Sequence, residues 1–261
     1  MRHPFFARPT GAPVLVLGHR GAAGSAPENT FASFARALAL GADVIETDLH
    51  VTRDGVPVLC HDRDIARTTD GEGAIAELDF ATLQRFDAGD GRPIPSLAEA
   101  LSAFPEARFN IEIKDARPGA SEAVLREVRE QGAAERVLLT AGVDATMARL
   151  REALSTARLE VAQGASAGDV LAFLRASRGL AAPAELPAEP MALQIPVAFQ
   201  GRTLVDSALL ACARHHGVEV HVWTVNDPAE MRRLRDLGVD GLVTDHPDRA
   251  RSLVDEAQGP G

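Results

Sequence analysis

The chain has 261 residues, 46% of them hydrophobic and 25% charged, with a formal net charge of -10. This length allows one large domain with a full hydrophobic core. The acidic balance argues against nucleic acid as a partner, because phosphate backbones are met by basic surfaces. The chain has no run of about 18 apolar residues to span a membrane, and its N-terminal apolar run is typical of a strand rather than of a signal peptide. We therefore expect a cytoplasmic protein with no integral membrane association.

The first predicted elements are a short apolar strand at 14–17 and a helix that begins near Asn29 or Thr30. Between them lies the sequence GHRG, so the strand ends at His19 and Arg20, and a glycine flanks this pair on each side. A second strand at 44–51 (VIETDLHV) alternates along its length, so that the side chains of Glu46 and Asp48 share one face.

The rest of the chain continues the alternation of strand and helix. Six further strands are predicted at 109–113, 137–140, 159–162, 192–195, 218–223 and 241–243. Helical patterns lie at 96–104, 121–131, 145–154, 169–175, 206–216 and 228–237. Eight such alternations indicate an α/β fold, a (β/α)8 TIM-type barrel, with a doubly wound open sheet as the alternative. Residues 62–95 form a polar insertion after the second strand, a lid or side wall, so we expect a single domain over 1–261.

Polar and aromatic side chains occur at or near the carboxyl ends of the predicted strands. In a parallel barrel these ends meet at one mouth, which is where active sites lie. We expect one site there. In chain order, its candidates are His19, Arg20, Glu46, Asp48, Glu112, Lys114, Trp223 and Asn226.

A second histidine is predicted to reach the same mouth through a hairpin. The pair Asp54-Gly55 is a strong signal for a two-residue turn. With that turn, Asp48 faces His61 on the neighbouring strand, and both lie on one face of the ribbon. A longer turn would shift this register by one residue.

Three carboxylates at one mouth repel one another unless they bind a cation. Oxygen ligands suit a hard ion, so Glu46, Asp48 and Glu112 predict a site for Mg²⁺ or Ca²⁺. Arg20 and Lys114, the only lysine in the chain, would add positive charge suited to a phosphate.

The two histidines complete the chemistry. Imidazole titrates near neutrality, so His19 and His61 could flank the phosphate as general base and general acid. A site that binds a phosphodiester between a general acid and a general base can hydrolyse one of its ester bonds. A barrel that only binds phosphate would not need both rings.

The chain resembles the glycerophosphodiester phosphodiesterase family of the phospholipase-C-like phosphodiesterases. The matching segments are GHRG with PENT, IETDLHVTRDGVPVLCHD, IPSLAEAL, NIEIK and VHVWTVNDPAEMRRLRDLGVDGLVTDHP. The resemblance implies a TIM-type barrel and a divalent metal, Mg²⁺ or Ca²⁺, that assists hydrolysis of small glycerophosphodiesters to glycerol 3-phosphate and an alcohol. It implies acid-base catalysis by His19 and His61, metal binding by Glu46, Asp48 and Glu112, phosphate binding by Arg20 and Lys114, organisation of the first loop by Glu28 and Asn29, and a glycerol-pocket wall at Trp223.

Several alternatives stay open. The same scaffold could carry a lysophospholipase D-type or a phosphoinositide phospholipase C-like activity, or it could be a non-catalytic phosphate-binding barrel. Residues 159–190 show little likeness to the family, so the sequence leaves the leaving alcohol open. A homo-oligomer is compatible with the sequence.

Overall fold

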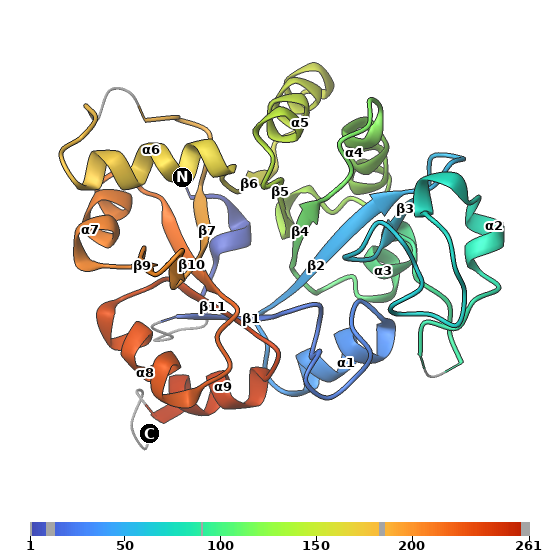
Figure 1. Cartoon of the computed structure of the whole chain (residues 1–261), viewed down its shortest axis with the longest axis horizontal. Coiled ribbons are helices and arrows are strands. Elements are labelled where there is room, and N and C mark those ends of the chain that lie inside the picture. The colour runs from blue at the N-terminus through green and yellow to red at the C-terminus, as the bar shows by residue number, and fades with distance from the viewer. Residues whose placement is uncertain (1, 9–13, 90, 183–185, 257–261) are drawn as a thin grey trace.

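Eight parallel strands curve into a nearly closed barrel with helices on its outside (Figure 1). The computed structural model describes residues 2–8, 14–89, 91–182 and 186–256. The barrel strands are β1 (Leu15–Gly18), β2 (Val44–Val51), β4 (Phe109–Ile113), β5 (Val137–Thr140), β6 (Ala162–Gln163), β7 (Ala192–Pro196), β10 (Glu219–Trp223) and β11 (Gly241–Thr244).

The strand order is β6-β5-β4-β2-β1-β11-β10-β7. The two ends of this series meet, because Gly164 bridges Ala192 in parallel and the Met191 amide donates to the Gln163 carbonyl at 2.8 Å. The predicted barrel is therefore confirmed, and the open sheet is excluded. The closing contact is brief, since β6 has only two residues.

Helices pack around the barrel in chain order, and most were predicted. They are α1 (Phe31–Ala39), α2 (Phe80–Leu83), α3 (Leu97–Ala103), α4 (Ala120–Glu130), α5 (Asp144–Ala157), α6 (Ala167–Ser177), α7 (Ser207–His215), α8 (Pro228–Leu237) and α9 (Pro247–Glu256). The short 3-10 turns are η1 (Pro4–Phe6), η2 (Ile75–Glu77) and η3 (Ala134–Arg136). No helix within the described ranges is both long and apolar enough to cross a membrane.

Two large apolar clusters lie between the barrel and its helices. One joins β7 and β10 to α6–α9 and includes Phe173 and Leu234, and the other joins β2, β4 and β5 to α1 and α3–α5 and includes Phe34 and Phe109. A smaller cluster fills the barrel, where η1 contributes Phe5. The strands that carry the predicted site residues are therefore packed closely against helices or against the barrel interior.

The hairpin after β2 corrects one prediction. β2 pairs antiparallel with β3 (Pro57–Leu59), with Leu49 opposite Leu59. The predicted facing of Asp48 and His61 is therefore wrong by one residue, and the Cys60 amide donates to the Asp48 carbonyl at 3.0 Å. The turn has three residues instead of two, and its last one, Gly55, adopts φ 84°.

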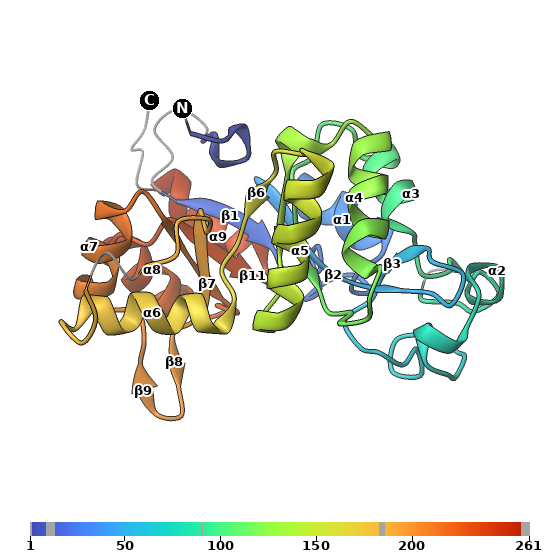
Figure 2. The same ribbon diagram turned by 90° about the horizontal axis from the view of Figure 1, so that it is seen from above.

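Two excursions leave the barrel. Residues 62–95 follow β3 and enclose a cluster of their own that includes Ile65, Ile75 and Leu83, beside the barrel in Figure 1. A second excursion, the hairpin of β8 (Ala198–Phe199) and β9 (Arg202–Thr203), follows β7 and projects from the barrel in Figure 2. No strand was predicted from the sequence for this hairpin.

Candidate active site

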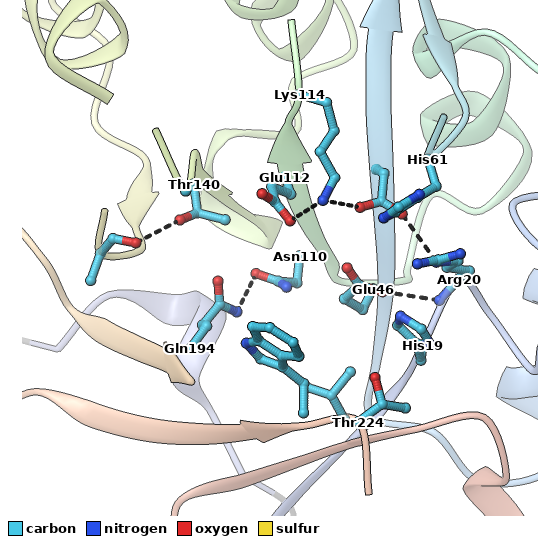
Figure 3. Close-up of a pocket in the computed structure, with 15 residues that line it drawn as sticks. His19, Arg20, Glu46, His61, Asn110, Glu112, Lys114, Thr140, Gln194 and Thr224 are labelled. Carbon is cyan, nitrogen blue, oxygen red and sulfur yellow. Dashed lines mark hydrogen bonds and ion pairs between the residues drawn. The ribbon is translucent and has the colours of Figure 1, made fainter. Parts of the chain in front are cut away.

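A polar cavity of about 250 Å³ opens at the carboxyl ends of the barrel strands (Figure 3). Its lining comes from β2, β4, β5, β7, β10 and β11 and from the loops after β1, β3, β4, β5, β6 and β10. All the predicted site residues line it except Glu28, Asn29 and Asn226, which lie behind its wall. Its lining residues are His19, Arg20, Glu46, Asp48, His61, Asn110, Glu112, Lys114, Thr140, Gly142, Ala165, Gln194, Trp223, Thr224 and Val243.

The glycines of GHRG allow the first loop to fold tightly. A side chain on Gly18 would place its Cβ 2.3 Å from the Gly21 carbonyl oxygen. Gly21 itself has φ 88°, and a Cβ there would lie 2.3 Å from the Ser33 hydroxyl of α1. The chain therefore turns directly from β1 against α1, which leaves His19 and Arg20 at the cavity.

Arg20 joins three parts of the site, as Figure 3 shows in part. Its backbone amide donates to Glu46 Oε2 at 3.0 Å, and its Nη1 donates to Glu28 Oε1 at 2.9 Å. Its Nε lies 3.3 Å from Asp48 Oδ2. Burial raises the pKa of Glu28, but Arg67 and Arg20 outweigh burial and leave that pKa lowered. Glu28 thus stays anionic and holds the guanidinium of Arg20.

Asn29 fixes the loop that follows. It adopts φ 56°, a left-handed conformation that asparagine tolerates better than most residues. Its Oδ1 accepts a hydrogen bond from the Thr47 hydroxyl at 2.7 Å. The PENT segment is thereby attached to β2 behind the cavity.

A carboxylate orients the first histidine. His19 Nδ1 lies 2.6 Å from Asp245 Oδ1, and Asn226 Nδ2 donates to the other oxygen of Asp245 at 2.6 Å. Burial lowers the pKa of His19, but the hydrogen bond to Asp245 and the charge of Glu46 outweigh burial, and the net shift is upward. Because the carboxylate accepts from Nδ1, Nε2 of His19 is left for proton exchange.

The second histidine has a matching partner. His61 Nδ1 lies 2.6 Å from Asp62 Oδ1. Arg67, from the insertion, contacts Asp62 and also donates to Glu28 at 2.7 Å. The hydrogen bonds from Arg67 and then His61 lower the pKa of Asp62 to about 2. The insertion therefore braces the partners of both His61 and Arg20.

The three predicted metal ligands lie at the centre of the cavity. Burial and the neighbouring Asp48 raise the pKa of Glu46 to about 7. Lys114 Nζ lies 2.7 Å from Glu112 Oε2 and 3.2 Å from Asp48 Oδ1. Asp48 Oδ2 is buried and accepts no hydrogen bond, although Arg20 Nε lies 3.3 Å from it. A buried carboxylate oxygen that accepts no hydrogen bond, beside two further carboxylates, fits a hard cation.

The side chains of Glu46, Asp48 and Glu112 are not arranged to coordinate one ion together. Within the described part of the chain, no three His, Cys, Asp or Glu side chains are grouped so that they could hold one ion. The ammonium of Lys114 lies between Asp48 and Glu112 instead. The donor chemistry fits a divalent cation, and binding one would require these side chains to rearrange.

The opposite wall is neutral. Gln194 on β7 donates to Asn110 Oδ1 on β4 at 2.8 Å across the cavity (Figure 3). Trp223 at the end of β10 is 45% exposed, so it is a wall residue and not part of the core.

Sequence reasoning missed four of these residues: Asp62, Asn110, Gln194 and Asp245. Asp245 directly follows β11, so the rule that selected His19 at a strand end could have found it.

Comparison with known proteins agrees with this geometry. The model of the glycerophosphoryl diester phosphodiesterase family matches residues 19–249. A Mycobacterium tuberculosis protein named "Probable glycerophosphodiester phosphodiesterase 2" is 34% identical, with 92% of this chain and 90% of that protein covered. The glycerophosphodiester phosphodiesterase of Caldanaerobacter subterraneus subsp. tengcongensis is 30% identical, with 92% and 97% covered.

A solved structure supports the same relationship. The structure of an Oleispira antarctica phosphodiesterase in complex with the product sn-glycerol-3-phosphate is 26% identical, with a TM-score of 0.73, and covers 92% of this chain and 96% of that one. The resemblance noted in the sequence is therefore confirmed over nearly the whole chain. The chain belongs to the glycerophosphoryl diester phosphodiesterase family.

Proposed function

We propose that this protein hydrolyses glycerophosphodiesters to a glycerol 3-phosphate and an alcohol, with His19 and His61 as the acid-base pair. The observation that carries the proposal is the paired arrangement of the two rings. Each lines one cavity and has Nδ1 fixed by a carboxylate, Asp245 or Asp62. Family membership supports the substrate class, and the solved relative that holds sn-glycerol-3-phosphate supports the product.

In the proposed reaction, water adds to phosphorus and the bond from phosphorus to the alcohol oxygen breaks. Nε2 of His19 accepts the proton of the water, and Nε2 of protonated His61 gives a proton to the departing alcohol oxygen. Asp245 stabilises the imidazolium that forms on His19, because a carboxylate at Nδ1 favours the charged ring.

The substrate phosphate would lie against the positive charges of Arg20 and Lys114. Glu46, Asp48 and Glu112 would hold a divalent cation, Mg²⁺ or Ca²⁺. Such a cation supplies charge that stabilises the phosphoryl oxygens. Lys114 would then leave the carboxylates it now bridges and become available to the phosphate.

The first experiment is a panel of glycerophosphodiesters, assayed for glycerol 3-phosphate before and after EDTA, then after Mg²⁺ or Ca²⁺ is added back. We expect release that EDTA abolishes and one of the two ions restores. Release that survives exhaustive chelation would contradict the metal site but not the hydrolysis.

Phosphorus NMR of the products separates the remaining alternatives. A cyclic glycerol phosphate as the final product would indicate a phospholipase C-like lyase. Saturable binding of glycerophosphocholine by the folded, metal-loaded protein with no choline released over hours would contradict catalysis and favour a phosphate-binding barrel.

A further inference from the structure

Arg67 lies outside the polar cavity but contacts two carboxylates that support it. Its Nη2 and Nη1 donate to the two oxygens of Glu28 at 2.7 and 2.9 Å, and its Nε donates to Asp62 Oδ2. The other oxygen of Asp62 lies 2.6 Å from His61 Nδ1. One guanidinium therefore joins the carboxylate that orients His61 to the loop that follows β1.

These contacts use the planar shape of the arginine side chain. Two parallel hydrogen bonds run from Arg67 to one carboxylate, and a third runs to another. Bidentate pairs of this kind add geometric specificity as well as energy. A lysine ammonium is a single point charge and would not reproduce them. The carboxylates of Glu28 and Asp62 are thus held in one fixed relation.

The insertion at 62–95 holds the backbone of Arg67 in place. Arg67 lies in a turn that begins at Ile65, whose carbonyl accepts hydrogen bonds from the amides of Thr68 and Thr69 at 3.2 and 3.0 Å. Ile65 is fully buried in the apolar cluster of the insertion, and its own amide donates to the Gly73 carbonyl at 3.1 Å. The turn that carries Arg67 is therefore anchored in the core of the insertion.

The insertion acts on the site from outside it. It lies beside the barrel in Figure 1, and none of its described residues lines the cavity. Its contact with the site passes through Asp62 and Arg67. Arg67 is 48% exposed, and an exposed ion pair adds only about 0–1 kcal/mol of stability. Stability alone therefore explains little about a series of charged contacts that ends on His61.

We infer that Arg67 is a positioning residue for the proposed general acid: it fixes Asp62, and Asp62 directs Nε2 of His61 at the oxygen of the departing alcohol. This inference rests on the proposed function, in which His61 protonates that oxygen. Without Arg67, the partly exposed carboxylate of Asp62 is free to turn toward water, and the ring of His61 loses its fixed direction. Proton transfer to the alcohol needs that direction, whereas the attack of water, assisted by His19, does not use His61.

The test compares two esters of glycerol 3-phosphate that differ in the leaving group. Choline leaves as a strongly basic alkoxide unless it is protonated, whereas 4-nitrophenolate leaves near neutral pH without a proton. Single-turnover rates are measured, so that product release does not mask the chemical step. Arg67→Met should release choline from glycerophosphocholine about 10–10²-fold more slowly, because misplacement of a catalytic group costs up to this much. The 4-nitrophenyl ester should be affected far less, so the ratio of the choline rate to the nitrophenol rate should fall about tenfold or more.

Arg53→Met is the matched control. Arg53 also donates to a carboxylate, that of Asp79, through Nε and Nη2, and neither residue lines the cavity. The ratio of the two rates should stay unchanged in this variant. An equal loss on both esters in Arg67→Met, or no loss on either, would overturn the inference. A fall of the ratio in Arg53→Met as large as that in Arg67→Met would overturn it as well.

His61→Ala separates failure of the inference from failure of the proposed function. Its ratio should fall at least as far as that of Arg67→Met. An unchanged ratio in His61→Ala would remove the acid assignment from the proposed function, and the inference with it. If His61→Ala lowers the ratio and Arg67→Met does not, the inference alone is wrong.

A double variant shows whether Arg67 acts through His61. In the His61→Ala background, Arg67→Met should slow choline release by less than a further factor of about two, since residues that act as a unit do not contribute additively. A further loss as large as the loss in the wild-type background would contradict action through His61.

Discussion

His19 and His61 are oriented by carboxylates that are themselves held by other groups. Asn226 holds Asp245, and Arg67 holds Asp62. An imidazole held at Nδ1 keeps its other nitrogen in one direction, which general acid-base catalysis requires. The rings therefore depend on residues that do not line the cavity.

We expect His19→Ala and His61→Ala each to lower the rate of glycerol 3-phosphate release by about 10²–10⁴-fold, since each removes one proton-transfer group. Thermal unfolding and metal binding should change little, because both side chains line a cavity and neither is a proposed ligand. The exposed pair His215→Ala and His216→Ala at the end of α7 is the control. A near wild-type rate in either cavity variant would refute the acid-base assignment.

Asp245→Asn tests the dependence of His19 on its partner. Asp245 raises the pKa of His19, so its neutralisation should lower that pKa. A base must be unprotonated, so the rate increases as pH rises through the pKa of His19. The acidic limb of the kcat/KM profile should therefore move to lower pH, while kcat falls.

The control for this shift is Asp236→Asn, which changes a 62% exposed side chain on α8. An acidic limb that stays in place in Asp245→Asn would show that His19 is not the group that titrates there.

The residues at the strand ends could be predicted from the sequence better than the side chains that form hydrogen bonds with them. Strand ends follow from periodicity, and a parallel barrel brings them together whatever the details of packing. Asp62 was missed because its role arises from a side-chain contact with His61, which spacing does not encode. Asp245 stands at a strand end, so its place could be predicted, but its contact with His19 could not. His61 lines the cavity even though its predicted register was wrong, because it stands beyond the last paired residue of β3.

At the scale of elements, the turn after β1 is tightly constrained. Gly21→Ala should destabilise the protein by roughly 2–5 kcal/mol, because it adds a left-handed alanine and a clash with Ser33. Gly55→Ala is a matched control with nearly the same φ, 84°, and no heavy atom within 4 Å of the new Cβ. It should cost only about 1 kcal/mol.

Chemical denaturation compares the two variants. If both lose the same free energy of unfolding, the close approach of the first loop to α1 is not what requires Gly21.

Several elements could not be read from the sequence for physical reasons. The predicted strand at 159–162 is β6, Ala162–Gln163, because α5 ends only at Ala157 and the next residues carry the chain to the barrel. α9 was missed because its sequence is largely charged, although Ala250, Leu253 and Val254 give it a buried face. The hairpin register depended on whether the turn has two or three residues, which Asp54-Gly55 does not decide.

At the scale of the whole molecule, the burial of Glu46 beside Asp48 opposes the folded state, and a bound divalent cation would offset this penalty. Mg²⁺ or Ca²⁺ should therefore raise the thermal unfolding midpoint. At a free-ion concentration of a hundred times Kd, the free energy of unfolding should increase by about 2.7 kcal/mol. Glu112→Gln should lose most of this gain, whereas Glu122→Gln, on the exposed side of α4, should retain it. Differential scanning calorimetry with and without EDTA measures both. An unfolding midpoint that neither ion changes would contradict the carboxylate site.

The short β6 has a consequence for how substitutions can alter such a barrel. The residues proposed for acid-base chemistry and for metal and phosphate binding come from β1, β2, β4 and the loops beside them, and none of these strands takes part in the junction of β6 and β7. That junction has few hydrogen bonds to lose, and α6 and the β8–β9 hairpin flank it. Substitutions or insertions there can reshape the entrance while the strands that carry out the reaction keep their register. The barrel thus holds the residues proposed for the reaction on strands other than the two that form this junction, so a change of substrate range at the junction would not require a new catalytic centre.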